Sequence, residues 1–429
     1  MRDVARPLIT TSSDRVLMYS QDSFGLGHLR RLTNLAHHLV AQRPELSVLL
    51  VVDSPVAPFF ALPANVDFVK LPTVVKVDAG VFRSGRLRID YAEIRSLRAR
   101  MLRDLVVRFA PGVLLVDHMP GGANRELLPA LAAIERARLP TRAVLGLRDI
   151  IDRPEVTCAV WQDEGAYALL ERHYRRVLIY GAPDVFPTAD RYRIAAAVGD
   201  RVHYCGYVCN MAAVPDRDVV RARLGYGDRP VVAVMAGGGA DAAQLLQTCL
   251  EATRAVAARR PLTTSIVTGP FLPAHERDEL RARAAAHDVV VHTSIDDPLG
   301  HIHAADVVVG MAGYNTVTEM MRLARRAIVV PRAGPSAEQG MRARLLAQRG
   351  LVDMVDPGQL TPATLAAAIE HALDAPPRRA PLPDLDGVAN ASAALLAELD
   401  AVPATRPRPQ PEPQPEPQRQ QVQEASPPV

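Results

Sequence analysis

The sequence predicts an α/β fold of two successive domains, each with a parallel sheet covered by helices. Short runs rich in Val, Leu and Ile alternate with longer helical patterns along most of the 429 residues. The strand candidates are continuously apolar, which is typical of strands buried on both faces of a parallel sheet. The alternation pauses around residues 202–215 and then starts afresh, so we expect two Rossmann-like domains that face one another.

The first domain follows this alternation from its first apolar run onward. Its predicted strands are short runs dominated by valine, leucine and isoleucine: Val16–Ser20, Leu46–Val52, Val66–Lys70, Val113–Asp117, Ala143–Leu147 and Val177–Tyr180. Its predicted helices lie between them: His28–Gln42, Tyr91–Phe109 and Ala123–Arg136. Because strands alternate with helices along the chain, we expect the strands to pair in parallel.

The second domain repeats the pattern at similar size. Its predicted strands are Val231–Met235, Thr264–Thr268, Val289–His292, Val307–Val309 and Ile328–Val330. Its predicted helices are Ala240–Ala258, Tyr314–Leu323, Glu338–Arg349 and Pro362–Leu373. In open sheets of this kind ligands bind at the carboxyl ends of the strands, so we look for functional residues there.

These patterns divide the chain into five segments. We expect an N-terminal extension over 1–14, one Rossmann-like domain over 15–209 and a second over 210–375. Residues 376–402 contain a helix candidate, Val388–Leu399, that we expect to pack back across the interface. Nine of the last 27 residues are proline, which predicts a disordered Pro/Gln-rich tail over 403–429. A proline-motif ligand for a partner is the alternative interpretation of this tail.

Composition and charge exclude several classes of protein. The net charge of +3 is small for this length, so we expect no nucleic-acid partner. Four cysteines are too few for a disulfide scaffold, which indicates free thiols in a reducing compartment. The first 14 residues do not read as a secretory signal, and no apolar run reaches the ~20 residues that span a bilayer. We therefore expect a cytoplasmic protein, at most peripheral to the inner face of the membrane.

One segment leaves a membrane contact open. Arg83–Arg108 carries eight arginines against three acidic residues, and Ile94, Leu97, Met101 and Leu105 form an apolar stripe. A basic amphipathic helix of this kind can touch anionic lipid or a phosphorylated acceptor. The alternative is a helix that packs one face and solvates the other.

The first motif with chemical content follows the strand Val16–Ser20. Glycines at a strand-to-helix turn let the backbone approach a ligand, and the N-terminus of the following helix favours negative charge. Gly25, Gly27 and Arg30 are therefore candidates for a phosphate or acceptor loop, and His28 for a base or a donor to phosphate oxygens. A tight turn with a capping histidine is the alternative.

The second motif is the triple glycine Gly237–Gly239, which ends the first strand of the second domain. Gly237, Gly238 and Gly239 precede a helix and can form a phosphate-cradling loop. A plain flexible turn is the alternative interpretation.

The third motif, from Asp306 to Ala343, is the most specific. It reads strand, glycine turn, helix, strand, loop and helix. Glu319 lies in the first turns of its helix, where a carboxylate can accept hydrogen bonds from ribose hydroxyls. Glu338 and Gln339 offer acceptors and donors suited to sugar hydroxyls. Backbone N–H groups of the turn can face a pyrophosphate; these belong to Gly313, Tyr314, Asn315 and Thr316.

The segment Asp306–Ala343 resembles the nucleotide-sugar signature of glycosyltransferase family 28, which includes the transferase that adds N-acetylglucosamine to the lipid-linked cell-wall precursor. The resemblance implies the GT-B fold, in which two Rossmann-like domains face across a cleft. The domain over 15–209 would bind the acceptor and the domain over 210–375 the nucleotide-sugar donor. The resemblance further implies that Glu319 holds the ribose and Gln339 the donor sugar. Gly237–Gly239 and Gly313–Thr316 would hold the phosphates, and the strand end at Thr293 would contact the base. The short Gly-Leu-Gly-His turn and the absence of serine after Gly239 depart from the family pattern.

Sugar transfer needs a base for the acceptor hydroxyl and stabilisation of the leaving diphosphate. His28 is the first candidate for the base and His118, at a strand end, the second. Asp117 and Asp149 also lie at or near strand ends, where they can orient a base or bind acceptor hydroxyls. For each, a loop-capping role is the alternative. Helix N-termini can replace a metal at the diphosphate, so we expect neither metal nor cofactor.

The leading hypothesis is an inverting, metal-independent glycosyltransferase of the hexosyltransferase type. Inversion and a UDP-sugar donor are implied by the resemblance, and the acceptor, whether saccharide, lipid-linked or small molecule, stays unidentified. A nucleotide-sugar hydrolase or epimerase of the same fold is the first alternative. A nucleotide-sugar-binding protein without turnover is the second.

Overall fold

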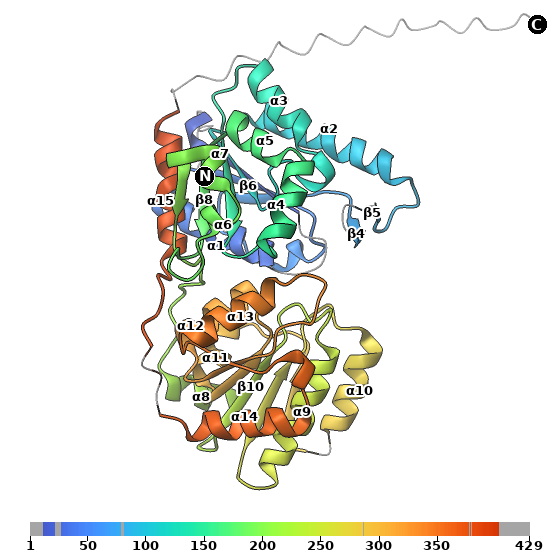
Figure 1. Cartoon of the computed structure of the whole chain (residues 1–429), viewed down its shortest axis with the longest axis vertical. Helices are drawn as coiled ribbons and strands as arrows, with labels where there is room; N and C mark the ends of the chain where they lie inside the picture. The colour runs from blue at the N-terminus through green and yellow to red at the C-terminus, as the bar shows by residue number, and fades with distance from the viewer. Residues whose placement is uncertain are drawn as a thin grey trace, which may run out of the picture.

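The computed structural model describes residues 12–21, 27–78, 81–285, 287–376, 378 and 380–402. They form two α/β domains stacked along the long axis of the molecule (Figure 1). One domain contains a seven-stranded parallel sheet and the other a six-stranded parallel sheet. This confirms the predicted fold class. The tail predicted for 403–429 lies outside the described residues, as do residues 1–11 of the predicted extension.

The N-terminal sheet has the strand order β3-β2-β1-β6-β7-β8-β9. Its strands are β1 (Arg15–Ser20), β2 (Ser47–Val52), β3 (Val66–Lys70), β6 (Val113–Asp117), β7 (Arg142–Arg148), β8 (Tyr174–Tyr180) and β9 (Val202–Tyr204). The strand order runs outward in opposite directions from β1 and β6, so this pair is the switch point of the sheet. The connections that follow β1 and β6 leave toward opposite sides, and a crevice therefore opens at the carboxyl ends of these two strands. Ser20 and Asp117 are Cα partners there.

The C-terminal sheet repeats this plan with the order β12-β11-β10-β13-β14-β15. Its strands are β10 (Val231–Met235), β11 (Thr263–Val267), β12 (Val289–His292), β13 (Val307–Gly310), β14 (Ala327–Val329) and β15 (Asp353–Met354). The switch point lies between β10 and β13, whose carboxyl ends lead into the triple-glycine turn and the third motif. Both predicted phosphate loops therefore meet at one place.

Helices cover both sheets. Those of the N-terminal domain are α1 (Gly27–Gln42), α2 (Tyr91–Phe109), α3 (Leu128–Arg136), α4 (Pro154–Asp163), α5 (Ala166–His173), α6 (Thr188–Arg191) and α7 (Ile194–Val198). Those of the C-terminal domain are α8 (Arg217–Leu224), α9 (Ala243–Ala257), α10 (Ala274–Ala284), α11 (Pro298–Ala304), α12 (Tyr314–Leu323), α13 (Glu338–Gln348) and α14 (Pro362–Asp374). Short 3₁₀ turns are η1 (Ser12–Asp14), η2 (Ala57–Phe59), η3 (Ala123–Arg125), η4 (Gly199–Arg201) and η5 (Pro357–Gln359).

Several local features differ from the sequence prediction, among them a broken helix and an additional hairpin. The helix predicted over 123–136 is broken, because Asn124 takes a left-handed conformation with φ of 43° inside η3 and α3 begins only at Leu128. An antiparallel hairpin, β4 (Val74–Asp78) with β5 (Val81–Ser84), was not predicted and projects from the N-terminal domain beside α2 (Figure 1). No described helix is long and apolar enough to cross a membrane.

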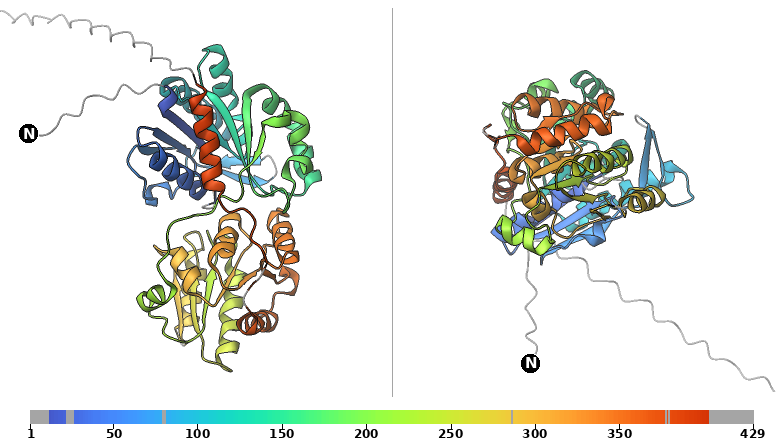
Figure 2. Two further views of the ribbon diagram at one scale, coloured as in Figure 1. Left: turned by 90° about the vertical axis from the view of Figure 1, so that its left-hand side faces the viewer. Right: turned by 90° about the horizontal axis from the view of Figure 1, so that it is seen from below.

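The last helix, α15 (Gly387–Asp400), returns from the C-terminal domain and packs on the N-terminal domain against α1, β6, β7 and β8 (Figure 2). The buried carboxylate of Glu398 receives Nε of Arg142 at 2.6 Å and Nε of Arg176 at 2.9 Å. Apolar side chains of α1, α12, α13 and α15 belong to one continuous core that extends through both domains. The two switch points are thus held against each other by packing as well as by chain connectivity.

Candidate active site between the domains

The two switch points face each other through the first turns of α1 and α12, which are in contact (Figure 1). α1 follows β1, and α12 follows β13. Both helices direct their N-termini, where N–H groups are unpaired, to the same region between the domains. Gly27 opens α1, whereas the predicted loop residue Gly25 lies outside the described residues.

His28 is held by a buried carboxylate. Its Nδ1 lies 2.7 Å from Oδ2 of Asp117, the last residue of β6. Nη2 of Arg31 donates to the same oxygen at 2.9 Å and also lies 2.9 Å from Nδ1 of His28. Burial would raise the pKa of Asp117, but the charges of Arg31 and then His28 outweigh it and lower this pKa. The aspartate is therefore a permanent anion that orients the imidazole.

His118, the second base candidate, lies beside His28 with ring centroids 5.4 Å apart. Its φ of 81° is rare for a residue with a side chain, and its backbone N–H donates to Gly146 O at 2.8 Å. Burial, then the charges of Arg148 and His28, lower the pKa of His118. Its Nδ1 is buried without a hydrogen-bond partner among the described residues. His118 is thus a neutral imidazole within reach of the same space as His28.

The first turn of α12 contacts the first turn of α1 through polar side chains. Nδ2 of Asn315 donates to Gly27 O at 3.1 Å, and Nη2 of Arg30 forms an ion pair with Oε1 of Glu319. The Glu319 side chain is only 4% exposed. Burial raises the pKa of Glu319, and Arg30 offsets part of that effect. Glu319, which we predicted to bind the ribose, and Arg30, which we predicted to bind a phosphate or the acceptor, are therefore ion-paired with each other in this structure.

Tyr314 fastens the two domains together. Its hydroxyl accepts from Val208 N at 2.8 Å and donates to Tyr180 O at 3.0 Å. Its ring is buried, with the guanidinium carbons of Arg31 and Arg342 at 5.3 and 5.6 Å from the ring centroid. The side chain is fully engaged, so the predicted donor contact of Tyr314 is left to its backbone N–H.

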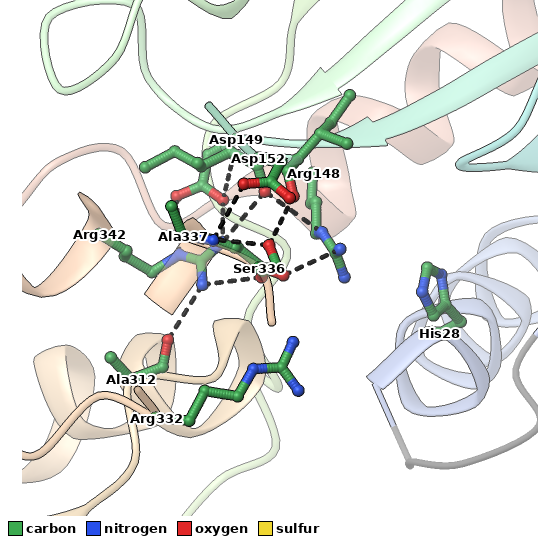
Figure 3. Close-up of polar contacts among 12 residues, drawn as sticks. His28, Arg148, Asp149, Asp152, Ala312, Arg332, Ser336, Ala337 and Arg342 are labelled. Carbon is green, nitrogen blue, oxygen red and sulfur yellow. Dashed lines mark hydrogen bonds and ion pairs between the residues drawn. The ribbon is translucent and has the colours of Figure 1, made fainter. Parts of the chain in front are cut away.

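Asp149 and Glu338 are bound by arginines. Arg342 of α13 donates to both Asp149 oxygens, at 3.0 and 2.6 Å, and to Ala312 O at 3.0 Å (Figure 3). The two Glu338 oxygens receive Arg148 and Arg342, each at 2.9 Å. Burial would raise the pKa of Glu338, but Arg148 and Arg342 outweigh it and lower this pKa. In the described structure these two carboxylates bridge the domains through Arg148 and Arg342.

The loop before α13 adds further bridges. Ala337 N donates to Oδ1 of Asp152 at 2.9 Å (Figure 3). Oε1 of Gln339 accepts Arg332 N at 3.2 Å, so its amide nitrogen remains to donate. Gln339, which we expected to hold the donor sugar, is thereby fixed at the start of α13.

The triple-glycine turn adopts conformations that require glycine. Gly237 has φ of 64° and Gly239 of 87°, and a Cβ on Gly239 would lie 2.0 Å from Thr268 O. A Cβ on Gly237 would meet Thr316 Oγ1 at 3.6 Å, so this turn and the first turn of α12 adjoin. Gly238 O accepts Phe271 N at 2.9 Å. The two predicted phosphate loops, Gly237–Gly239 and Gly313–Thr316, form one continuous backbone surface.

Thr293 follows β12, the edge strand of the C-terminal sheet. Its hydroxyl accepts Nη2 of Arg281 at 2.9 Å. Among the described residues no group of three or more His, Cys, Asp or Glu side chains is arranged to hold a metal ion. Nδ1 of His301 in α11 is hydrogen-bonded to the hydroxyl of Tyr226 at 2.8 Å.

Sequence reasoning did not find the arginines of this region. Arg31, Arg148, Arg332 and Arg342 each contact or adjoin a predicted site residue. Arg148 carried a usable signal, because it ends an apolar strand that enters the crevice. Arg31 and Arg342 also pair with Asp117 and Asp149, which are distant in sequence, so no local pattern marks these contacts.

The architecture defines the class of protein. The chain is similar to the crystal structure of MurG of Acinetobacter baumannii, with a TM-score of 0.54 at 15% identity over 90% of this chain and 99% of that one. It is also similar to a putative UDP-N-acetylglucosamine 2-epimerase of Listeria monocytogenes, with a TM-score of 0.59 at 13% identity over 90% of this chain and 97% of that one. These identities show the fold alone. The chain has the GT-B fold, as the resemblance implied.

Sequence comparison relates the second domain to a known family. Residues 232–396 match the model described as the glycosyltransferase family 28 C-terminal domain. The chain is 35% identical over 156 residues to a UDP-N-acetylglucosamine–N-acetylmuramyl-(pentapeptide) pyrophosphoryl-undecaprenol N-acetylglucosamine transferase of Phenylobacterium zucineum, covering 35% of this chain and 41% of that protein. It is 26% identical over 283 residues to the protein of the same name in Exiguobacterium, covering 62% of this chain and 74% of that protein. The family model thus matches the second domain and part of α15, and the chain spans about two fifths of the length of the first of these relatives.

Proposed function

We propose that this chain is a glycosyltransferase of the hexosyltransferase type that moves a sugar from a UDP-sugar to an acceptor, with inversion and without a metal. One observation carries the proposal: α1, the helix that holds the His28–Asp117 pair, contacts α12 of the region that matches family 28 through Asn315–Gly27 and Arg30–Glu319. A base and a nucleotide-sugar site on opposite walls of one crevice are what sugar transfer requires.

The donor is assigned to the C-terminal wall. The diphosphate lies on the backbone surface of Gly237–Gly239 and Gly313–Thr316, where helix N-termini stabilise negative charge in place of a metal. Glu319 accepts from the ribose hydroxyls once Arg30 has moved aside. Gln339 holds the sugar through its amide nitrogen, and the backbone at Thr293 contacts the base. These roles rest on the family resemblance and on the positions of the residues.

His28 acts as the base in a single displacement. Its Nδ1–H donates to Asp117, so Nε2 is the ring nitrogen that takes the proton of the acceptor hydroxyl. The acceptor oxygen then forms a bond to the anomeric carbon while the bond to the donor diphosphate breaks. Because attack and departure occur on opposite faces of the carbon, the configuration inverts. UDP leaves with the bonding electrons, stabilised by the helix N-termini.

The alternatives differ in what accepts the sugar. The GT-B fold is shared with a structure described as an epimerase, so the fold alone does not separate transferase, hydrolase and epimerase. The family 28 match over the donor domain favours the transferase. In a donor-turnover assay, release of free sugar that no acceptor suppresses would favour a hydrolase, and conversion to an epimer would favour an epimerase.

A thermal-shift screen tests the donor assignment. The wild-type chain is measured with UDP, dTDP, GDP, ADP, NAD and several UDP-sugars, beside Glu319→Ala and the control Glu93→Ala, an exposed glutamate on α2. We expect UDP to raise the midpoint in wild type and control but not in Glu319→Ala. Stabilisation by none of these compounds would remove the proposal and leave binding or catalysis of another kind.

A further inference from the structure

Two arginines face the part of the crevice where the donor sugar is expected. Arg148 ends β7 of the N-terminal domain, and Arg332 lies in the loop before α13 of the C-terminal domain. In Figure 3 both guanidinium groups point into the space between the domains, with His28 on its far side. Arg148 is also the largest charge influence on the pKa of His118, after the effect of burial, so it lies near the base candidates.

The acceptor atoms of this wall are already used. Both Glu338 oxygens are bound by Arg148 and Arg342, and Oε1 of Gln339 accepts Arg332 N. Each of these oxygens therefore already accepts a hydrogen bond from an arginine N–H group. The wall offers hydrogen-bond donors instead: the amide of Gln339 and two guanidinium forks.

The guanidinium groups of Arg332 and Arg148 have N–H groups that can still donate hydrogen bonds. Nε of Arg332 is buried and has no hydrogen-bond partner among the described residues. Its Nη1 reaches Asp241 only at 3.4 Å, and that aspartate side chain is 48% exposed, so solvent screens the pair. Arg148 uses Nε for Ile150 O at 3.2 Å and Nη2 for Glu338 at 2.9 Å. Neutral sugar hydroxyls are both donors and acceptors, whereas a guanidinium fork matches a carboxylate, which only accepts.

We propose that the transferred sugar is a hexuronic acid, and that Arg332, supported by Arg148, binds its carboxylate. This inference rests on the proposed function, because it takes the position of the donor sugar from it. The two arginines come from different domains, so a carboxylated donor also bridges them. Arg332 is then the specificity-determining residue between acidic and neutral donors.

Titration calorimetry of the full chain with UDP, UDP-glucose and UDP-glucuronate tests this. In wild type we expect UDP-glucuronate to bind at least about tenfold more tightly than UDP-glucose, equal to about 1.4 kcal/mol. In Arg332→Gln that ratio should fall to near one while UDP binds as before. Arg332→Lys, which keeps the charge but loses the fork, should give an intermediate ratio. Arg259→Gln, at an exposed surface pair with Glu370, is the matched control.

Each other outcome overturns the inference at a distinct point. Equal affinity for the two UDP-sugars in wild type would overturn it and leave the proposed function intact. An equal loss of UDP and UDP-glucuronate affinity in Arg332→Gln would mean that the arginine binds the diphosphate instead of the sugar. Binding of none of the three nucleotides would overturn the proposed function, and this inference with it. Thermal unfolding of each variant establishes that it is folded.

Discussion

The charged side chains of the crevice are buried in pairs that join elements far apart in sequence. Arg31 with Asp117 and Arg342 with Asp149 are each at most 1% exposed. A buried pair is costly to form but more costly to break, because removal of one partner leaves an uncompensated charge. These buried ion pairs therefore hold the side chains of the candidate site in their observed positions.

Asp117→Asn tests the buried pair through pH. Because the pKa of Asp117 is lowered in the folded chain, its contribution to stability is fully present above the unfolded value of ~4 and is lost as pH falls toward the folded value. We expect the variant to be about 3 kcal/mol less stable at pH 7, with the difference from wild type shrinking below pH ~4. Urea unfolding at several pH values measures it. A difference that does not change with pH would contradict this.

His28→Ala tests the base. We expect UDP release from a UDP-sugar with acceptor to fall by about 10²–10⁴-fold while UDP affinity is retained. His37→Ala on the exposed face of the same helix should behave as wild type. If His28→Ala turns over normally, the base must be another residue, and the partly buried His118 is next to be tested.

At the scale of elements, the sequence predicted the strands and helices with strong apolar patterns. Tyr91–Phe109, Val113–Asp117 and Tyr314–Leu323 have the predicted bounds. The helices α8 and α10 were not predicted, because each is rich in charged residues and buries only two side chains. The helices that could be predicted are those whose burial requires an apolar face, and not those that rest on intrinsic helix preference.

Unlike α8 and α10, α15 has an apolar face that is deeply buried against the N-terminal domain. Leu395 is 0% exposed in the core that α15 shares with α1 and α12. We expect Leu395→Ala to lower the free energy of unfolding by about 3 kcal/mol. Leu382→Ala, at a 47% exposed leucine, should lower it by less than about 0.5 kcal/mol. Equal urea midpoints for the two variants would show that α15 is not part of the core.

At the scale of the whole molecule, the sequence predicted candidate site loops but not the contacts that their residues make. His28, Glu319 and the glycine turns were identified from local patterns. Their partners were not, because Arg30 and Glu319 are 289 residues apart and Arg342 and Asp149 are 193 apart. Such contacts depend on how two separately folded domains meet, and no periodicity in the chain records that.

The Arg30–Glu319 pair predicts a competition between domain contact and donor. If ribose takes the place of Arg30 at Glu319, Arg30→Ala should bind UDP about three- to tenfold more tightly than wild type. Arg43→Ala, whose exposed partner Asp400 lies on α15, is the control and should leave UDP affinity unchanged. Weaker UDP binding in Arg30→Ala would mean that Arg30 itself contacts the nucleotide.

The most direct test of a donor site between the domains is hydrogen exchange with and without saturating UDP. We expect slower exchange at the first turns of both α1 and α12 and at Gly237–Gly239, no change in α10, and loss of the effect in Glu319→Ala. Protection confined to one domain, or absent from α12 while UDP binds, would contradict a donor site in the crevice between them.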